Sequence, residues 1–289
     1  MQEGLIITAL ETMEDGMIVL DNDWCYQFSN YSAQTLFPVL RNCVKAEDVT
    51  HKPDWPKQFK RRTNSVTVNF EQNDSGGVLQ YYRASIRTVE NPQGAQIGWS
   101  IVIRNVTEVT VMINQMEVLA TTDPLTGIYN RRNFYARVCQ EMDRARRHPV
   151  EMSLILFDID HFKVVNDTYG HSVGDIVLCG VVEATKNQLR PYDIFARYGG
   201  EEFVIFTTSE DTLDLQQFSD RLRKAIEDMC IAYGGDEIKI TASYGAVKVL
   251  PHDSIDNAFV AVDKALYQAK SQGRNRSIIG EIQAEERLL

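Results

Sequence analysis

The chain has 289 residues, 44% of them hydrophobic and 24% charged, which is the balance of folded rather than disordered proteins. Its formal net charge of −10 argues against a broad surface for nucleic acid polymers or anionic membranes, because such surfaces need clustered Lys and Arg. The five cysteines show no CxxC spacing, and no apolar run reaches the ~18 residues of a membrane span. We therefore expect a cytoplasmic protein without a membrane segment in this chain, or a soluble fragment of a membrane-attached protein.

The first predicted domain covers residues 1–105 and has the order of an α+β fold. A helix is expected at 31–36, because Asn30 before it is a good N-cap residue. Residues 41–63 are polar and are expected to be irregular. Strands bounded by turn residues are expected at 16–20, 24–28, 65–70, 78–89 and 95–104.

Parts of this first domain resemble the PAS family of sensor domains. The resemblance depends on EDGMIVLD at 14–21, FSN at 28–30 and IVIRNVTE at 101–108, and it covers about the first 108 residues. It implies an antiparallel sheet with small helices that senses a signal and regulates the rest of the chain. The sequence names no ligand for it.

Residues 106–120 contain no Gly or Pro and are expected to form one helix. Val109, Met112, Met116 and Leu119 follow one another at intervals of 3, 4 and 3 residues. This spacing is typical of the seam of a coiled coil. A single amphipathic helix that packs on its own domain has the same spacing. Because the segment lies between two predicted domains, we favour a helical linker through which two copies form a homodimer.

The second predicted domain, residues 121–289, alternates strands with helices, which favours a central sheet covered by helices. The last residues, 284–289, are expected to form a frayed tail. Strands are expected at 154–157, 203–206 and 237–249, and helices at 133–147, 173–188, 213–229 and 255–271.

Two groups of carboxylates lie next to apolar strands in this domain. Asp158 and Asp160 follow the strand at 154–157 and would share a face if the strand continued, although a solvated strand end is the alternative for this pair alone. Glu201 and Glu202 follow the glycine pair 199–200, which we expect to form a hairpin turn; the glycines permit positive φ and let the backbone approach a ligand. Adjacent carboxylates repel each other unless a cation lies between them. With Asp158 they are candidates for a Mg²⁺ site, because Mg²⁺ prefers hard oxygen ligands.

The order of motifs in this half resembles that of GGDEF-domain diguanylate cyclases, over roughly residues 119–280. The segment RYGGEEF at 197–203 is similar to the family signature in its GGEEF variant. Four further motifs agree in order: DPLTGIYNRR at 123–132, DIDHFK at 158–163 with the ND, GH and GD pairs after it, SYG at 243–245, and ALYQAK at 265–270 with GRN at 273–275. The resemblance implies a nucleotidyl-cyclase-like sheet.

The resemblance also implies roles for individual residues. Asp158, the carbonyl of Ile159, Glu201 and Glu202 would hold Mg²⁺, with Mn²⁺ as an alternative, and Glu201 would assist deprotonation of the attacking hydroxyl. Asn166 and Asp175 would bind guanine, whose edge offers the donors that a carboxylate accepts. The residues that would surround the phosphates of GTP are Phe162, Lys163, Gly199, Gly200, Lys270 and Arg274.

The implied reaction joins two GTP molecules into cyclic di-GMP and releases two pyrophosphates, with one GTP on each of two facing domains. Arg190 and Asp193 match the RxxD site at which the family binds its product as an inhibitor, and Arg221 is a candidate further contact from a facing domain. A simple surface pair of Arg190 with Asp193 is the alternative. Two other functions remain open: a non-catalytic sensor that binds GTP or cyclic di-GMP, and a dimerisation module whose second half is structural.

Overall fold

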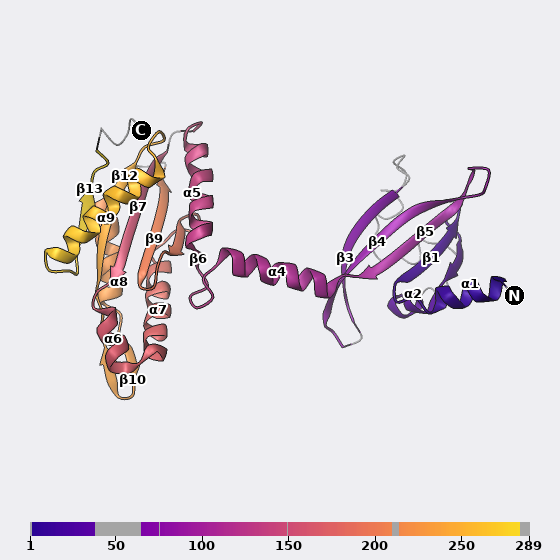
Figure 1. Ribbon diagram of the computed structural model, residues 1–289, viewed down its shortest axis with the longest axis horizontal. Helices are drawn as coiled ribbons and strands as arrows, with labels where there is room; N and C mark the ends of the chain where they lie inside the picture. The colour runs from indigo at the N-terminus through magenta and orange to yellow at the C-terminus, as the bar shows by residue number, and fades with distance from the viewer. Residues whose placement is uncertain (1, 38–64, 75, 149, 210–213, 284–289) are drawn as a thin grey trace. The chain divides into compact units, whose positions relative to one another are not determined.

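The computed structural model describes residues 2–37, 65–74, 76–148, 150–209 and 214–283 (Figure 1). The chain divides into two compact units, Met1–Gln115 and Met116–Leu289. The segment expected to be irregular, 41–63, and the expected tail, 284–289, lie outside the described residues.

The first unit contains a five-stranded antiparallel sheet of order β2-β1-β5-β4-β3. The side chain of Asn30 caps α2 by accepting from the N–H of Ala33, as predicted, and donates to the carbonyl of Leu10 near the end of α1. Trp24, expected in a strand, instead lies in the turn before β2 with φ 64°. The elements are α1 (Gln2–Glu11), β1 (Gly16–Asp21), β2 (Tyr26–Ser29), α2 (Tyr31–Leu36), β3 (Ser65–Asn73), β4 (Leu79–Glu90) and β5 (Gln96–Asn105).

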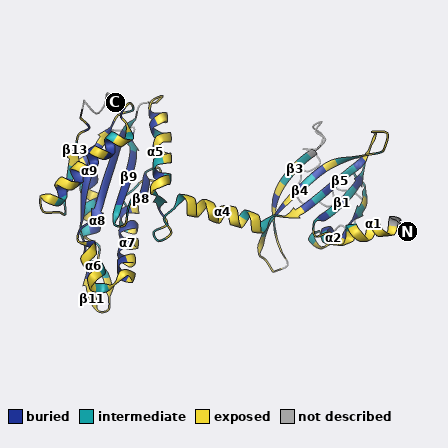
Figure 2. Cartoon of the chain, viewed as in Figure 1, coloured by how far each residue is buried: buried dark blue, intermediate teal, exposed yellow. Residues whose placement is uncertain are grey.

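Helix α4 (Thr107–Thr121) confirms the helix expected between the two halves. None of its residues is buried, and Figure 2 shows it exposed along its length. The four seam residues, Val109, Met112, Met116 and Leu119, are between 58% and 67% exposed. The helix therefore does not bury this seam against its own chain. Neither α4 nor another helix of the described residues has the length and apolar character to cross a membrane.

The second unit is built on a six-stranded sheet of order β13-β12-β7-β9-β8-β6. Strand β7 lies inside the sheet and is antiparallel to both neighbours, β12 and β9, whereas the β12–β13 and β8–β6 pairs are parallel. The strands are β6 (Tyr129–Asn130), β7 (Glu151–Ile159), β8 (Ile194–Arg197), β9 (Glu202–Ser209), β12 (Ala242–Val249) and β13 (Ser277–Gly280).

Helices cover both faces of this sheet, as expected from the sequence. Strand side chains alternate between faces: Leu154 and Leu156 join the core formed with α5 (Arg131–Ala145) and α9 (Ile255–Ser271). Ile155 and Phe157 join the opposite core, formed with the remaining helices. These are α6 (Phe162–Tyr169), α7 (His171–Lys186) and α8 (Leu215–Glu227).

The single strand expected at 237–249 is wrong. Gly234 and Gly235, with φ of 61° and 95°, turn β11 (Asp236–Ile238) back onto β10 (Ile231–Tyr233) in a separate two-stranded sheet. Strand β12 then starts only at Ala242. The helix expected from Leu213 is confirmed as α8 from Leu215, capped by Asp214, while Leu213 itself lies outside the described residues.

Candidate functional site

Asp158 lies at the end of β7, where three strands of the second unit meet. Its register partners are Glu202 on β9 and Ser243 on β12. The Nζ of Lys270, from the last turn of α9, lies 3.0 Å from Oδ2 of Asp158, whose side chain is only 9% exposed. The fold therefore brings three segments to one end of the sheet. They are the glycine turn at 199–203 (the signature turn), the strand β7 that leads into Asp158 and Asp160, and the helix α9.

The carboxylates at this end of the sheet raise one another's pKa. Burial raises the pKa of Asp158, and the charge of Asp160 raises it further, while Lys270 and Arg274 oppose the shift. Burial also raises the pKa of Glu201, with a second contribution from the charge of Asp158. Additional positive charge here would stabilise both ionised carboxylates.

The signature turn is a hairpin turn between β8 and β9, as expected. Its main chain is closed by the N–H groups of Tyr198 and Gly199, which donate to the carbonyl of Glu202 at 2.8 and 3.2 Å. The expected use of positive φ is wrong, because neither Gly199 nor Gly200 has it. What Gly200 provides is space: a Cβ built there meets no atom within 4 Å. A ligand can thus approach this backbone closely.

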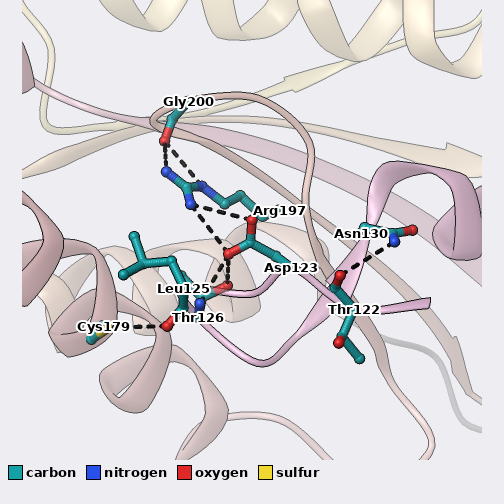
Figure 3. Close-up of polar contacts among 8 residues, drawn as sticks. All are labelled: Thr122, Asp123, Leu125, Thr126, Asn130, Cys179, Arg197 and Gly200. Carbon is teal, nitrogen blue, oxygen red and sulfur yellow. Dashed lines mark hydrogen bonds and ion pairs between the residues drawn. The ribbon is translucent and has the colours of Figure 1, made fainter. Parts of the chain in front are cut away.

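Arg197 holds the turn from inside the domain (Figure 3). Its Nε and Nη2 both donate to the carbonyl of Gly200, at 3.1 and 2.6 Å. Its Nη1 lies 3.1 Å from Oδ1 of Asp123, which also accepts from the main-chain N–H and the hydroxyl of Thr126. Burial raises the pKa of Asp123, but the Thr126 hydrogen bonds and the Arg197 charge outweigh it, so the pKa lies below its usual value.

The expected guanine residues lie on two adjoining helices, Asn166 on α6 and Asp175 on α7. The side chain of Asn166 lies against Gly174, the residue before Asp175: a Cβ at position 174 would overlap Oδ1 of Asn166 and lie 3.2 Å from the ring of Phe162. Phe162 itself is 6% exposed and belongs to the core, so its side chain cannot contact a phosphate. Its main-chain N–H in the first turn of α6, and the exposed Lys163, can do so.

Asp160 has a structural role, because its carboxylate is occupied by hydrogen bonds within the domain. Its carboxylate accepts from the hydroxyls of Thr241 and Ser243, both at 2.7 Å, and from the main-chain N–H of Asn275 at 3.1 Å. These hydrogen bonds connect β7 to the loop after α9. The sequence pattern D-x-D alone does not separate the two roles.

The loop after α9 presents Arg274 in an unusual backbone conformation. Arg274 and Asn275 have φ of 61° and 44°, which is rare for residues other than glycine. The side chain of Asn275 donates to Glu227 at 2.7 Å and accepts from Arg223 at 2.8 Å, both on α8. Asn275 therefore fixes the loop, and Arg274 is close enough for its charge to lower the pKa of Asp158.

The RxxD residues form a turn of their own, before β8. The N–H of Arg190 donates to Asp193 at 2.8 Å, and Thr207 donates to the other carboxylate oxygen at 2.6 Å. The Arg190 guanidinium contacts the hydroxyl of Tyr192 at 2.9 Å instead of Asp193, so the alternative of a simple surface ion pair is wrong. Arg221 donates to the carbonyl of Gln188 at 3.3 Å, two residues before Arg190.

The expected metal ligands are only partly assembled by side chains. Among the described residues, no three His, Cys, Asp or Glu side chains are grouped closely enough to hold a metal ion. The side chain of Ile159 is buried, so only its carbonyl could be a ligand. The carboxylate oxygens of Asp158 and Glu201 are nevertheless the hard ligands that a divalent cation prefers, and Lys270 provides the positive charge at Asp158 in this structure.

Comparisons with known proteins agree with this geometry. Residues 120–276 match the family described as "Diguanylate cyclase, GGDEF domain". A diguanylate cyclase from Vibrio cholerae is 31% identical over 222 residues, which are 76% of this chain and 69% of that protein. Diguanylate cyclase DgcP from Pseudomonas aeruginosa is 39% identical over 157 residues, 54% of this chain and 23% of that protein.

Two solved structures from Caulobacter crescentus share the fold of this half. The GGDEF domain of DgcB in complex with c-di-GMP has a TM-score of 0.53 and 32% identity, covering 55% of this chain and 95% of that one. The coiled coil and GGDEF domain of DgcB, also with c-di-GMP, has a TM-score of 0.57 and 29% identity, covering 61% of this chain and 93% of that one.

The second unit thus contains a GGDEF-type α+β domain, and the chain belongs to the GGDEF diguanylate cyclase family. The turn of Gly199-Gly200-Glu201-Glu202-Phe203 lies within the residues that match the family. The chain spans 23% to 48% of the length of the first curated relatives it matches.

Proposed function

We propose that this chain is a diguanylate cyclase that joins two GTP molecules into cyclic di-GMP with release of two pyrophosphates. The observation that carries the proposal is the meeting of Asp158, Glu201 and Lys270 at one end of the sheet, beside an open glycine turn. Carboxylates with raised pKa values next to fixed cations suit a polyphosphate substrate with a divalent cation. Family membership supports the same reaction.

Mg²⁺, or Mn²⁺ in its place, would be held by Asp158, the carbonyl of Ile159, Glu201 and Glu202. When bound, such an ion supplies Lewis-acid stabilisation of charge on the phosphate oxygens. Lys270 and Arg274 neutralise the outer phosphates beside the turn of Gly199 and Gly200, and the open backbone at Gly200 admits them. The first turn of α6, with Lys163, provides further N–H and ammonium donors.

Guanine is proposed to bind between Asn166 and Asp175. A carboxylate accepts hydrogen bonds from the N–H groups of the guanine edge, which adenine does not offer in that pattern. Asp175 is exposed in the free chain, and a bound base would cover it. An acceptor that is covered without receiving a hydrogen bond costs about 1–3 kcal/mol, so Asp175 favours GTP over ATP. The 3′-hydroxyl of each GTP then attacks the α-phosphate of the other, and Glu201 assists its deprotonation. Alignment of two domains supplies much of the rate.

Two copies must face each other for this reaction, and we propose that α4 joins them. Its seam of Val109, Met112, Met116 and Leu119 is exposed in the single chain. The first unit is proposed to be a PAS-like sensor domain whose state changes how often the two catalytic domains meet. Product bound at Arg190 and Asp193, with Arg221 nearby, would hold the two catalytic domains apart.

The cytoplasm is the proposed compartment, because GTP is present there and thiols stay reduced. The free cysteines of the described residues are Cys25, Cys139, Cys179 and Cys230.

The decisive experiment is to strip the purified protein of bound nucleotide and incubate it with GTP and Mg²⁺. We expect cyclic di-GMP and two pyrophosphates per product molecule, and far less product with ATP. Glu201→Gln should bind GTP without turnover. A folded dimer that forms no cyclic di-GMP would refute the catalytic proposal.

A non-catalytic GTP or cyclic di-GMP sensor is the second candidate function. It would bind nucleotide without turnover, and a purely structural dimerisation module would bind none. Asp158, Glu201, Lys270 and the open turn at Gly200 are all in place, which favours catalysis.

A further inference from the structure

Three aromatic rings form a cluster beside the signature turn, against the core that α5 and α9 build on one face of the sheet. Tyr198, the residue before Gly199, stacks on Phe259 of α9 with ring centroids 5.0 Å apart and an interplanar angle of 19°. Phe259 also stacks on Tyr135 of α5 at 5.1 Å, and the hydroxyls of Tyr135 and Tyr198 lie 3.2 Å apart. Tyr198 therefore connects the turn to two helices.

A cation completes this ring cluster. The guanidinium carbon of Arg131, the first residue of α5, lies 4.4 Å from the centroid of the Tyr198 ring and 6.0 Å from that of Tyr135. Arg131 follows Asn130, whose side chain caps α5 and also donates to the carbonyl of Ala120 in the last turn of α4. Because a guanidinium is attracted to the face of a tyrosine ring, Arg131 stabilises the ring of Tyr198 in this place.

The backbone of Tyr198 is hydrogen-bonded to the segment that carries the two acids of the turn. The N–H groups of Tyr198 and Gly199 both donate to the carbonyl of Glu202. The Glu202 side chain also lies against the turn, because a Cβ built on Gly199 would be 2.6 Å from its Oε2. A shift of Tyr198 would therefore move Glu202 directly, and Glu201 with it.

Tyr198 and its neighbour Arg197 hold the turn from opposite faces of the sheet, as expected of consecutive residues in an extended chain. Arg197 contacts Asp123 and the carbonyl of Gly200. Tyr198 packs on the other side, against the core of α5 and α9. The turn is thus fixed by two independent sets of contacts.

We propose that Tyr198 is a positioning residue for the divalent cation of the proposed cyclase. Its ring, held by Arg131 and Phe259, sets the place of the turn. The turn then sets where Glu201 and Glu202 present their carboxylates. The inference rests on the proposed function, because it concerns the same site, and it needs no contact between Tyr198 and the substrate.

A purely structural role of the ring cluster is the alternative. Loss of the cluster would then lower the stability of the domain and leave cation binding by the folded protein unchanged. Helix α5 offers a matched control, because Arg137 also lies over a ring, 4.2 Å from the centroid of Tyr129. Arg131→Met and Arg137→Met each remove one such contact from the same helix, and of the two it is Arg131 that lies over Tyr198.

The test is titration of the stripped chain with Mn²⁺, followed by electron paramagnetic resonance in the presence of a saturating non-hydrolysable GTP analogue. The values of kcat and KM for GTP are measured in parallel. Tyr198→Leu, which keeps an apolar side chain without a ring, should weaken Mn²⁺ binding at least about fivefold and lower kcat at least about tenfold. KM for GTP should stay within about threefold of wild type, because the base and the outer phosphates contact other elements.

Three further variants sharpen this test. Tyr198→Phe should stay within about twofold of wild type, because it keeps the ring contacts. Burial raises the pKa of Tyr198 to about 12, so the hydroxyl that this variant loses is uncharged. Arg131→Met should weaken Mn²⁺ binding about threefold, the size expected for loss of one exposed cation–π contact. Arg137→Met should bind Mn²⁺ as wild type does, although its urea midpoint should fall as that of Arg131→Met does.

Wild-type Mn²⁺ affinity and kcat in a folded Tyr198→Leu variant would overturn the inference, and so would equal losses in Arg131→Met and Arg137→Met. If Tyr198→Leu does not fold, the comparison of the two arginine variants decides. Turnover by wild type with unchanged Mn²⁺ binding in every variant rejects the positioning role and leaves the proposed function intact. Mn²⁺ binding that depends on Tyr198, without formation of cyclic di-GMP by wild type, supports the positioning role and rejects the catalytic proposal. A wild type that binds no Mn²⁺ rejects both.

Discussion

Nη1 of Arg197 lies 3.1 Å from Oδ1 of Asp123. Arg197 ends β8, just before the signature turn, and Asp123 lies just after the end of α4. Both side chains are largely buried, at 16% and 17% exposed. Nε and Nη2 of Arg197 donate to the carbonyl of Gly200 (Figure 3). One guanidinium thus links the start of the GGDEF domain to the turn that carries Glu201.

Asp123→Asn should lower the free energy of unfolding by about 1 kcal/mol at pH 7. The folded pKa of Asp123 is lowered, so its stabilisation is complete above the ordinary value of 3.8 and is lost as pH falls through the folded value. The difference between variant and wild type should therefore shrink in urea titrations at acidic pH. The exposed pair Arg146–Asp143, at 2.8 Å, is the control, and Asp143→Asn should cost less than about 0.5 kcal/mol.

Arg197→Lys should lower turnover at least about tenfold, because an ammonium group cannot replace the fork that contacts both Asp123 and Gly200. The measurement is kcat and KM for GTP with the stripped dimer. Unchanged kinetics in a folded Arg197→Lys variant would contradict a role for this pair in placing the turn.

Glu201→Gln should make the metal-free protein more heat-stable at pH 8. The folded pKa of Glu201 is raised, so its contribution to stability is present below the ordinary value of 4.5 and is lost as pH rises through the folded value. The gain in Tm should fade toward pH 4. Added Mg²⁺ should raise the Tm of wild type and leave that of Glu201→Gln nearly unchanged, since only the native site of wild type binds it. An equal Mg²⁺ effect on both proteins would remove Glu201 from the metal site.

Gly174→Ala should weaken GTP binding at least about tenfold, because the added Cβ overlaps Oδ1 of Asn166. Gly180→Ala is the control on the same helix: its Cβ would lie 3.1 Å from the flexible side chain of Met229. KM for GTP and direct titration with a non-hydrolysable GTP analogue are the measurements. Equal GTP affinity of the two variants would show that GTP binding does not depend on the present position of the Asn166 side chain.

Replacement of Met112 and Met116 by Glu should dissociate the dimer that we propose through α4. Both side chains are exposed in the single chain, at 58% and 60%, so the monomer should stay folded. Asn114→Glu with Gln115→Glu adds the same charge beside the seam and should leave the dimer intact. Sedimentation velocity measures both, and a dimer that survives the seam substitutions would move the interface elsewhere.

Local patterns in the sequence predicted most of the long elements, because their signals repeat within a few residues. The apolar strand at 154–157, the Asn30 cap and the helix at 255–271 all appear in the structure. Short elements were missed: α6, β8 and β13 have too few residues for a period to show. At 237–249 the Gly234-Gly235 turn marked a hairpin that the continuous apolar pattern concealed.

The candidate site was predicted by its motifs but not by its contacts. Asp123 and Arg197 both stood in motifs, yet a pair separated by 74 positions in the chain gives no local signal. Asp158 and Asp160 looked alike in sequence. Only their partners separate them: Asp160 accepts from Thr241, Ser243 and Asn275, whereas Asp158 pairs with Lys270.

The hydrogen bond from Asn275 to Asp160 spans 115 positions of the chain. During synthesis on the ribosome, Asp160 emerges long before the residue that must join it. At a synthesis rate of about 5–20 residues per second, several seconds separate the two events. A growing chain can build much of the sheet in that interval, but the loop that carries Arg274 is still missing. The proposed cyclase therefore cannot act until one of the last segments of the domain has been made.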